Sequence, residues 1–257
     1  MSFQPKAMIL VLTYHKVLRG PDPESEFYTI QAEHLERQLE SLAQGGFRAL
    51  APEELFDWKP RSDPAYLLSF DDGTADHYDI VLPLLAHHRC RAVFFAPTSK
   101  LDRAGYLTSK QVSELSRAGQ TIGLHSHEHR RLDWLGEEDI RVQMQLSHQI
   151  VQDLTGAPPV FFAPPGGYFD LRIRDIALES GIRVIRTMRW GYNQIPDLAA
   201  LECIPVNRHF TDEEFRRVLE FRRRSALYAA KEITKKLVPN RTYQWLRAGV
   251  FGRLRRK

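Results

Sequence analysis

Two stretches of the sequence carry residue types that could hold a metal ion and activate water. The first contains the adjacent carboxylates Asp71 and Asp72, followed by Gly73. Neighbouring side chains of an extended chain point in opposite directions, so one carboxylate could bind a metal while the other faces a substrate. Taken alone, Asp-Asp-Gly is also a common helix-cap and turn sequence, which is the alternative interpretation.

The second stretch is rich in histidine and runs from His125 to His129. If it forms a helical turn, these two imidazoles lie on one side, at a spacing that suits a shared metal ion. His127 would then point elsewhere, towards the surface or the surroundings of the site. A histidine-rich exposed loop without a metal is the alternative for this stretch taken alone.

Asp72, His125 and His129 together would give a metal three protein ligands and leave one position open for water, as in hydrolytic sites. Imidazole and carboxylate ligands favour Zn²⁺, with Co²⁺, Ni²⁺ and Mn²⁺ as alternatives. Water bound to such an ion becomes a nucleophile near neutral pH, and the ion polarises the carbonyl group under attack. Asp71, next to the ligand, could take the proton from that water.

Short apolar runs alternate with longer helical patterns, which indicates a parallel α/β sheet or barrel. The expected strands lie within residues 8–12, 66–70, 91–95, 121–124, 160–162, 183–186 and 203–206, and the expected helices within 32–42, 76–88, 108–118, 137–154 and 170–180. Seven strands favour a ring over a doubly wound open sheet, which is the alternative. In both arrangements the carboxyl ends of the strands meet on one face, so the two polar stretches would share one cleft.

Three segments resemble the polysaccharide deacetylase family, carbohydrate esterase family 4. They are Phe70-Asp71-Asp72-Gly73, His125-Ser126 with His129, and Phe162-Ala163-Pro164-Pro165-Gly166-Gly167, in the order found in the family. The resemblance implies a distorted (β/α)7-type barrel with a divalent metal, usually zinc, held by the second Asp and the two His. It also implies that the first Asp is the catalytic base and that the substrate is an acetylated glycan.

The N-terminal sequence Leu12-Thr13-Tyr14-His15 is similar to the branch of this family that deacetylates poly-N-acetylglucosamine during exopolysaccharide biosynthesis. That similarity implies that His15 is the general acid that protonates the leaving amine, with His209 as the reserve candidate. A histidine at the edge of the core, bonded to backbone, is the alternative interpretation of His15.

The third segment departs from the commoner family pattern. The arginine that pairs with the catalytic Asp in the family is replaced by Ala163, so another arginine would have to supply that charge. The candidates are Arg186, Arg189 and Arg208. The backbone N–H of Gly166 could donate to an oxyanion, because any residue type provides that donor; a rigid turn without a catalytic part is the alternative. Tyr168, Trp190 and Tyr192 are candidates for stacking on sugar rings, with core or rim packing as the alternative.

The composition is ordinary for a globular protein, with 43% hydrophobic and 26% charged residues. The apolar run 8–12 is too short for a signal-peptide core. No run reaches the roughly 20 residues that span a bilayer, so we expect a cytoplasmic protein. Cys90 and Cys203 have no metal-ligand spacing, and we expect two free thiols.

Charge is divided unevenly along the chain. Residues 222–257 contain 12 Lys and Arg and one acidic residue, whereas residues 1–221 contain 24 basic and 31 acidic residues. We therefore expect a catalytic domain over 1–221 and a basic amphipathic helical tail over 222–257. Such a tail could lie on the inner face of an anionic membrane, or be a solvated helix. Nucleic acid is not an expected partner, since no nucleic-acid-binding module is recognisable.

The residues predict a metal-dependent hydrolase, and the resemblance implies that it removes N-acetyl groups from N-acetylhexosamine units of a polysaccharide or lipid-linked glycan. Two alternatives remain open at this point. One is a deformylase or amidase of the same chemistry on another substrate. The other is a catalytically weak glycan-binding protein on the same scaffold.

Overall fold

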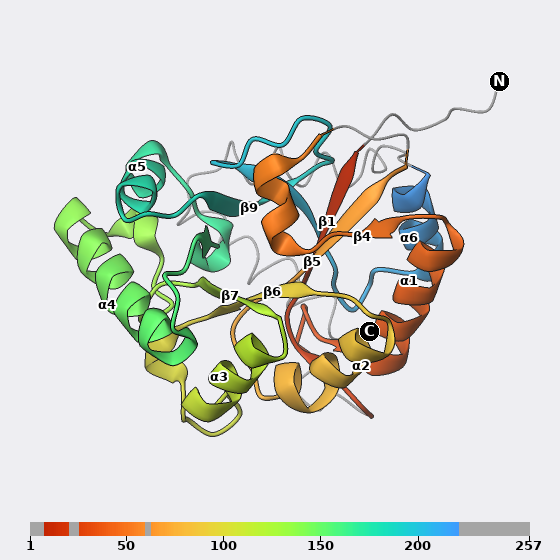
Figure 1. Ribbon diagram of the computed structural model, residues 1–257, viewed down its shortest axis with the longest axis horizontal. Helices are drawn as coiled ribbons and strands as arrows, with labels where there is room; N and C mark the ends of the chain where they lie inside the picture. The colour runs from red at the N-terminus through yellow and green to blue at the C-terminus, as the bar shows by residue number, and fades with distance from the viewer. Residues whose placement is uncertain (1–7, 21–25, 60–62, 221–257) are drawn as a thin grey trace, which may run out of the picture. The chain divides into compact units, whose positions relative to one another are not determined.

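Seven parallel strands close into a ring in the computed structural model, which describes residues 8–20, 26–59 and 63–220 (Figure 1). In order around the ring the strands are β1 (Ile9–Tyr14), β10 (Leu201–Pro205), β9 (Val184–Trp190), β8 (Phe161–Phe162), β7 (Thr121–Leu124), β6 (Ala92–Ala96) and β5 (Ala65–Phe70). The ring closes because β1 pairs with β10 on one side and with β5 on the other. The predicted barrel is confirmed, and the open sheet is excluded.

Helices follow most of the strands and lie outside the ring (Figure 1). They are α1 (Ala32–Gln44), α2 (Leu82–His87), α3 (Ser109–Arg117), α4 (Glu137–Thr155) and α5 (Leu171–Glu179). The chain then continues into α6 (Asp212–Leu219), most of which belongs to a separate unit that begins at Glu213. The five expected helices are confirmed. The one expected over 76–88 divides into the π-helix η2 (His77–Val81) and α2, a distinction that the apolar spacing does not reveal.

Several short elements have no clear signal in the sequence. Strand β4 (Arg48–Ala49) pairs with the start of β5, and β2 (Val17–Leu18) pairs with β3 (Ile30–Gln31) in a separate sheet. Four 3-10 helices complete the set: η1 (Pro52–Asp57), η3 (Thr98–Lys100), η4 (Leu132–Trp134) and η5 (Pro165–Gly167). Such elements are too short for periodicity to define them.

The inside of the ring changes from apolar to polar along the strands. Alternate strand residues form one buried hydrophobic cluster that includes Ile9 and Val11 of β1 and Leu67 of β5. The same side of these two strands continues in Thr13 and Ser69, whose hydroxyl oxygens lie 2.9 Å apart. Because side chains alternate along a strand, the next inward position after Ser69 belongs to Asp71, the first residue of the Asp-Asp pair.

Cys90 and Cys203 are buried and are not bridged to each other, as predicted. Among the described helices, none combines the length and apolar character needed to cross a membrane. The predicted basic tail over 222–257 lies outside the described residues. The boundary proposed at residue 221 stays a prediction.

Candidate active site

The two carboxylates of the Asp-Asp pair face different surroundings at the carboxyl end of β5. Asp71 is buried, with 4% of its side chain exposed, whereas 32% of the Asp72 side chain is exposed. The backbone turns sharply here, because Asp72 and Gly73 both adopt left-handed conformations, with φ of 75° and 62°. A Cβ on Gly73 would lie 2.9 Å from that of Ala96, so the turn requires glycine at this position.

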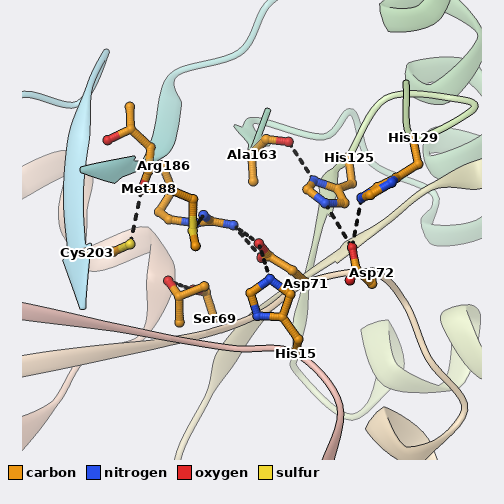
Figure 2. Close-up of polar contacts among 12 residues, drawn as sticks. His15, Ser69, Asp71, Asp72, His125, His129, Ala163, Arg186, Met188 and Cys203 are labelled. Carbon is orange, nitrogen blue, oxygen red and sulfur yellow. Dashed lines mark hydrogen bonds and ion pairs between the residues drawn. The ribbon is translucent and has the colours of Figure 1, made fainter. Parts of the chain in front are cut away.

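Asp72, His125 and His129 converge on one point at the mouth of the ring (Figure 2). Asp72 Oδ1 lies 3.3 Å from Nε2 of His125 and 2.9 Å from Nε2 of His129. One potential ligand atom from each residue lies within 4.8 Å of the other two. That separation suits a single ion with ligand distances of about 2.0–2.2 Å.

The predicted helical turn over residues 125–129 is wrong. The segment after β7 is an irregular loop in which Ser126 and His129 adopt left-handed backbone, with φ of 57° and 62°. The Ser126 hydroxyl accepts a hydrogen bond from the His129 N–H at 3.1 Å. Gln143 of α4 bonds both the backbone and the side chain of Glu128, each at 2.8 Å. Side-chain bonds within the loop, rather than helical geometry, bring the imidazoles together.

Hydrogen bonding determines which ring nitrogen of His125 faces Asp72. Nδ1 lies 2.7 Å from the backbone carbonyl oxygen of Ala163, and a carbonyl can only accept, so Nδ1 carries the proton. In the neutral ring Nε2 is then an acceptor, and it faces another acceptor, the Asp72 carboxylate, at 3.3 Å. Two facing acceptors repel each other unless a proton or a metal ion lies between them, and the convergence of a third ligand, His129, fits a metal ion.

Arg186 of β9 pairs with Asp71, the contact that the family resemblance assigns to an arginine at the position of Ala163. Its guanidinium donates to both carboxylate oxygens of Asp71, and 2% of the Arg186 side chain is exposed (Figure 2). The other two candidates point elsewhere. Arg189 donates to the backbone carbonyl of Ala200, and Arg208 is exposed.

The neighbours of Asp71 keep its carboxylate ionised. Burial alone would raise the pKa of Asp71, but Arg186 and, to a smaller extent, His15 and His125 hold it below its usual range. Burial would lower the pKa of Arg186, but the charge and hydrogen bonds of Asp71, together with Cys203, raise it above its ordinary value. A buried carboxylate that stays charged can accept a proton, as a general base must.

His15 lies beside Asp71, with its Nε2 3.8 Å from Asp71 Oδ2 (Figure 2). Its ring stacks on Tyr28, with ring centres 4.4 Å apart and planes inclined by 12°. Burial lowers the pKa of His15, and the attraction of Asp71 and Asp72 offsets part of that effect. The ring is therefore oriented by stacking while one nitrogen faces the Asp-Asp pair.

Two residues that the sequence analysis passed over support His15. His77 is fully buried, and its Nε2 lies 2.9 Å from the backbone carbonyl oxygen of His15. Asp76 accepts a hydrogen bond from the Val17 N–H at 2.7 Å. Both stand at the start of η2, just after the Asp-Asp-Gly turn, and π-helical segments are frequent at functional sites. The sequence signal that could have pointed to them is the polar pair Asp76 and His77 at the start of an amphipathic helix pattern.

Of the remaining predicted substrate contacts, Tyr168 and Trp190 have partners within the protein, and Gly166 is exposed. Gly166 lies in η5 with a φ of 64°. The guanidinium of Arg131 covers the ring of Tyr168, at 3.1 Å from its centre. Trp190 packs edge-on against Tyr192, with ring centres 5.2 Å apart. The structure therefore places Tyr168 and Trp190 in aromatic and cation contacts at the strand ends.

His209 and His127 contact other residues than the Asp-Asp pair. His209 is exposed, and its ring lies 5.9 Å from that of Phe27. No contact recorded for the described residues joins it to either carboxylate, whereas His15 is adjacent to one. His127 Nδ1 lies 2.9 Å from the Thr98 hydroxyl oxygen, so this histidine points elsewhere, as predicted.

Comparison with known proteins agrees with this fold. Residues 59–185 match the family model described as polysaccharide deacetylase. The chain is 24% identical to YxkH from Bacillus subtilis over 185 residues, which are 69% of this chain and 63% of that protein. It is 28% identical to a peptidoglycan-N-acetylglucosamine deacetylase from Bacillus cereus over 155 residues, or 58% of this chain and 67% of that one.

Solved structures share the barrel. A Streptococcus pyogenes deacetylase, PplD, in complex with acetate superimposes with a TM-score of 0.74 at 21% identity, covering 84% of this chain and 99% of that one. IcaB from Ammonifex degensii gives a TM-score of 0.73 at 22% identity, covering 83% and 96%. The chain carries a polysaccharide deacetylase domain of carbohydrate esterase family 4. It spans 63% of the length of YxkH, less than two thirds of that relative.

Proposed function

We propose that the protein is a metal-dependent deacetylase that removes N-acetyl groups from N-acetylhexosamine units of a polysaccharide or lipid-linked glycan. One observation supports this most directly. Three metal-type ligands converge beside a second carboxylate that Arg186 already neutralises. Names of relatives, among them a peptidoglycan-N-acetylglucosamine deacetylase and a chitin deacetylase, agree with this substrate class.

Each side chain of the site has a role in this proposal. Asp72, His125 and His129 would hold one divalent ion, for which zinc is our choice. When bound, such an ion supplies Lewis acidity at the acetyl carbonyl and makes water a stronger acid. Asp71 accepts the proton of the attacking water, and Arg186 keeps this carboxylate charged.

The remaining groups act on the substrate itself. His15 donates a proton to the amine nitrogen as the C–N bond breaks, which the leaving group needs because an amide anion is too basic to depart. The backbone N–H of Gly166 donates to the oxygen that becomes negative during attack. Water and amide thus yield acetate and a free amine.

Metal content and acetate release, measured on the same protein samples, test this assignment. We expect the zinc-loaded wild type to release acetate from N-acetylglucosamine oligomers. Asp71→Asn should keep the metal and lose turnover, by about 10²–10⁴-fold, as expected for loss of a general base. His125→Ala should lose both metal and turnover.

His127→Ala provides the matched control, since this histidine lies in the same loop and bonds Thr98 instead of facing Asp72. It should keep both metal and activity. Full turnover in Asp71→Asn would remove Asp71 from the role of base, and one equivalent of metal in His125→Ala would disprove the ligand set. Release of formate, or opening of a cyclic amide without any release of acetate, would favour the related amidases.

A further inference from the structure

An exposed tryptophan lies close to the candidate active site. Trp134 ends η4 and is 66% exposed, although tryptophan is highly buried on average. It follows His129 by five residues, and a chain of that length spans at most about 18 Å. A large aromatic surface is therefore open to solvent within reach of a molecule bound at the candidate metal ligands.

The indole is held in place by neighbours that do not cover it. The guanidinium carbon of Arg131 lies 4.2 Å from the ring centre of Trp134 and 3.1 Å from that of Tyr168. Asp133 pairs with the same guanidinium. Arg172 of α5 donates to the backbone carbonyl of Asp133 at 3.4 Å. These contacts fix the ring before any ligand arrives, which lowers the entropic cost of binding.

The contacts of Arg131 connect Trp134 to the histidine loop that ends at His129 and to the segment around η5. Arg131 follows His129 by two residues, and Tyr168 directly follows η5, which contains Gly166. Tyr168 was one of three residues predicted to stack on sugar, but it is partly buried and Arg131 lies over its ring, whereas Trp134 is 66% exposed. The exposed aromatic surface at this part of the rim therefore belongs to Trp134.

We propose that Trp134 forms a sugar-stacking subsite that binds a ring of the glycan next to the ring that is deacetylated, an inference that rests on the proposed function. A sugar ring presents an apolar C–H face and hydroxyls at its edge, so it needs an aromatic surface flanked by acceptors. Asp133 and Asp170 flank this corner, with 24% and 36% of their side chains exposed. Arg131 and Arg172 pair with these carboxylates, so the four side chains together carry no net positive charge that would attract an anionic lipid surface.

Chain-length dependence tests the subsite. Wild type, Trp134→Ala and Trp134→Phe are compared on the N-acetylglucosamine monomer, its pentamer and p-nitrophenyl acetate. We expect Trp134→Ala to lower kcat/KM for the pentamer about tenfold, through KM, the effect of leaving roughly 60 Å² of apolar surface in water. Turnover of the monomer and the small ester should not change, and Trp134→Phe should recover part of the loss.

Ile195→Ala is the matched control, because Ile195 is an exposed apolar residue (85%) in the loop between β9 and β10. It should leave all three substrates unaffected. An unchanged pentamer KM in Trp134→Ala, or an equal loss on all three substrates, would overturn the subsite. Loss of binding to phosphatidylglycerol vesicles, with pentamer kinetics intact, would assign the ring to lipid and overturn it as well.

Direct binding of the pentamer separates this inference from the proposed function. Titration calorimetry on Asp71→Asn and on the double variant with Trp134→Ala measures affinity without turnover. Weaker binding in the double variant supports the subsite even if the wild type releases no acetate, in which case only the proposed reaction fails. Equal affinity of the two proteins contradicts the subsite, whatever the activity of the wild type.

Discussion

The adjacent carboxylates Asp71 and Asp72 have opposite electrostatic surroundings. Asp71 is 4% exposed and bonds the buried guanidinium of Arg186, so its charge is balanced within the protein. Asp72 is 32% exposed and faces two imidazole nitrogens, one of which cannot donate a proton in its neutral form. The protein itself neutralises Asp71, whereas Asp72 and the two imidazoles are the ligands that we propose for a metal ion.

The difference shows how one turn can serve two chemical purposes. Side-chain alternation directs Asp71 into the ring, where β9 provides the arginine. The left-handed backbone at Asp72 and Gly73 directs the second carboxylate towards the histidine loop. A general base needs a charge that is maintained, whereas a metal ligand set needs negative charge that is not yet compensated.

Replacement of Arg186 should have the largest effect on the protein. Arg186→Met leaves Asp71 buried and unpaired, so we expect the free energy of unfolding to fall by about 3–5 kcal/mol, measured by urea denaturation. Burial would then raise the pKa of Asp71, and the acid limb of kcat/KM should move to higher pH. Arg186→Lys keeps the charge and should lose less. Equal stability of wild type and Arg186→Met would show that the buried pair is not the feature that separates the two carboxylates.

Metal should stabilise the protein through Asp72 and not through Asp71. Zinc at a free concentration of one hundred times its Kd should raise the free energy of unfolding by about 2.7 kcal/mol, and a chelator should abolish the gain. Asp72→Asn should lose this increment in thermal denaturation with and without zinc. Asp71→Asn starts from lower stability but should keep the increment. An increment that survives in Asp72→Asn would contradict the division of roles.

His77 should affect amide substrates more than activated esters. His77→Leu removes the hydrogen bond to the His15 carbonyl, and we expect a loss of about tenfold in acetate release from N-acetylglucosamine oligomers, the value of one such bond. Hydrolysis of p-nitrophenyl acetate should change less, because its leaving group needs no proton. His77→Gln can still donate and should recover part of the activity. Equal losses on both substrates would indicate a structural role alone.

Replacement of His209 should have the smallest effect. This histidine is exposed and lies against Phe27, so His209→Ala should leave kcat/KM for the oligomers unchanged. His15→Ala, by contrast, should lower it, because His15 lies beside Asp71. The reverse outcome would assign the acid role to His209 and would remove His15 from the site.

Most of the barrel could be predicted from the sequence because its strands are short, continuous and buried, and its helices carry a clear apolar stripe. Elements of two residues, such as β2 and β4, offer little or no periodicity to detect. The conformation of the His125–His129 loop could not be predicted either. Its left-handed residues depend on bonds from Ser126 and from Gln143, which lies in a later helix.

The sequence by itself determined the ligand types, the Asp-Asp turn and the alternation of strand and helix, because these depend on residue identity and on spacing along the chain. Only the tertiary structure decided which arginine pairs with Asp71 and which histidine stands beside it. Arg186 and Asp71 are separated by 115 residues, and both are brought together by closure of the ring. Contacts of that kind depend on which strands become neighbours, and no local pattern encodes that information.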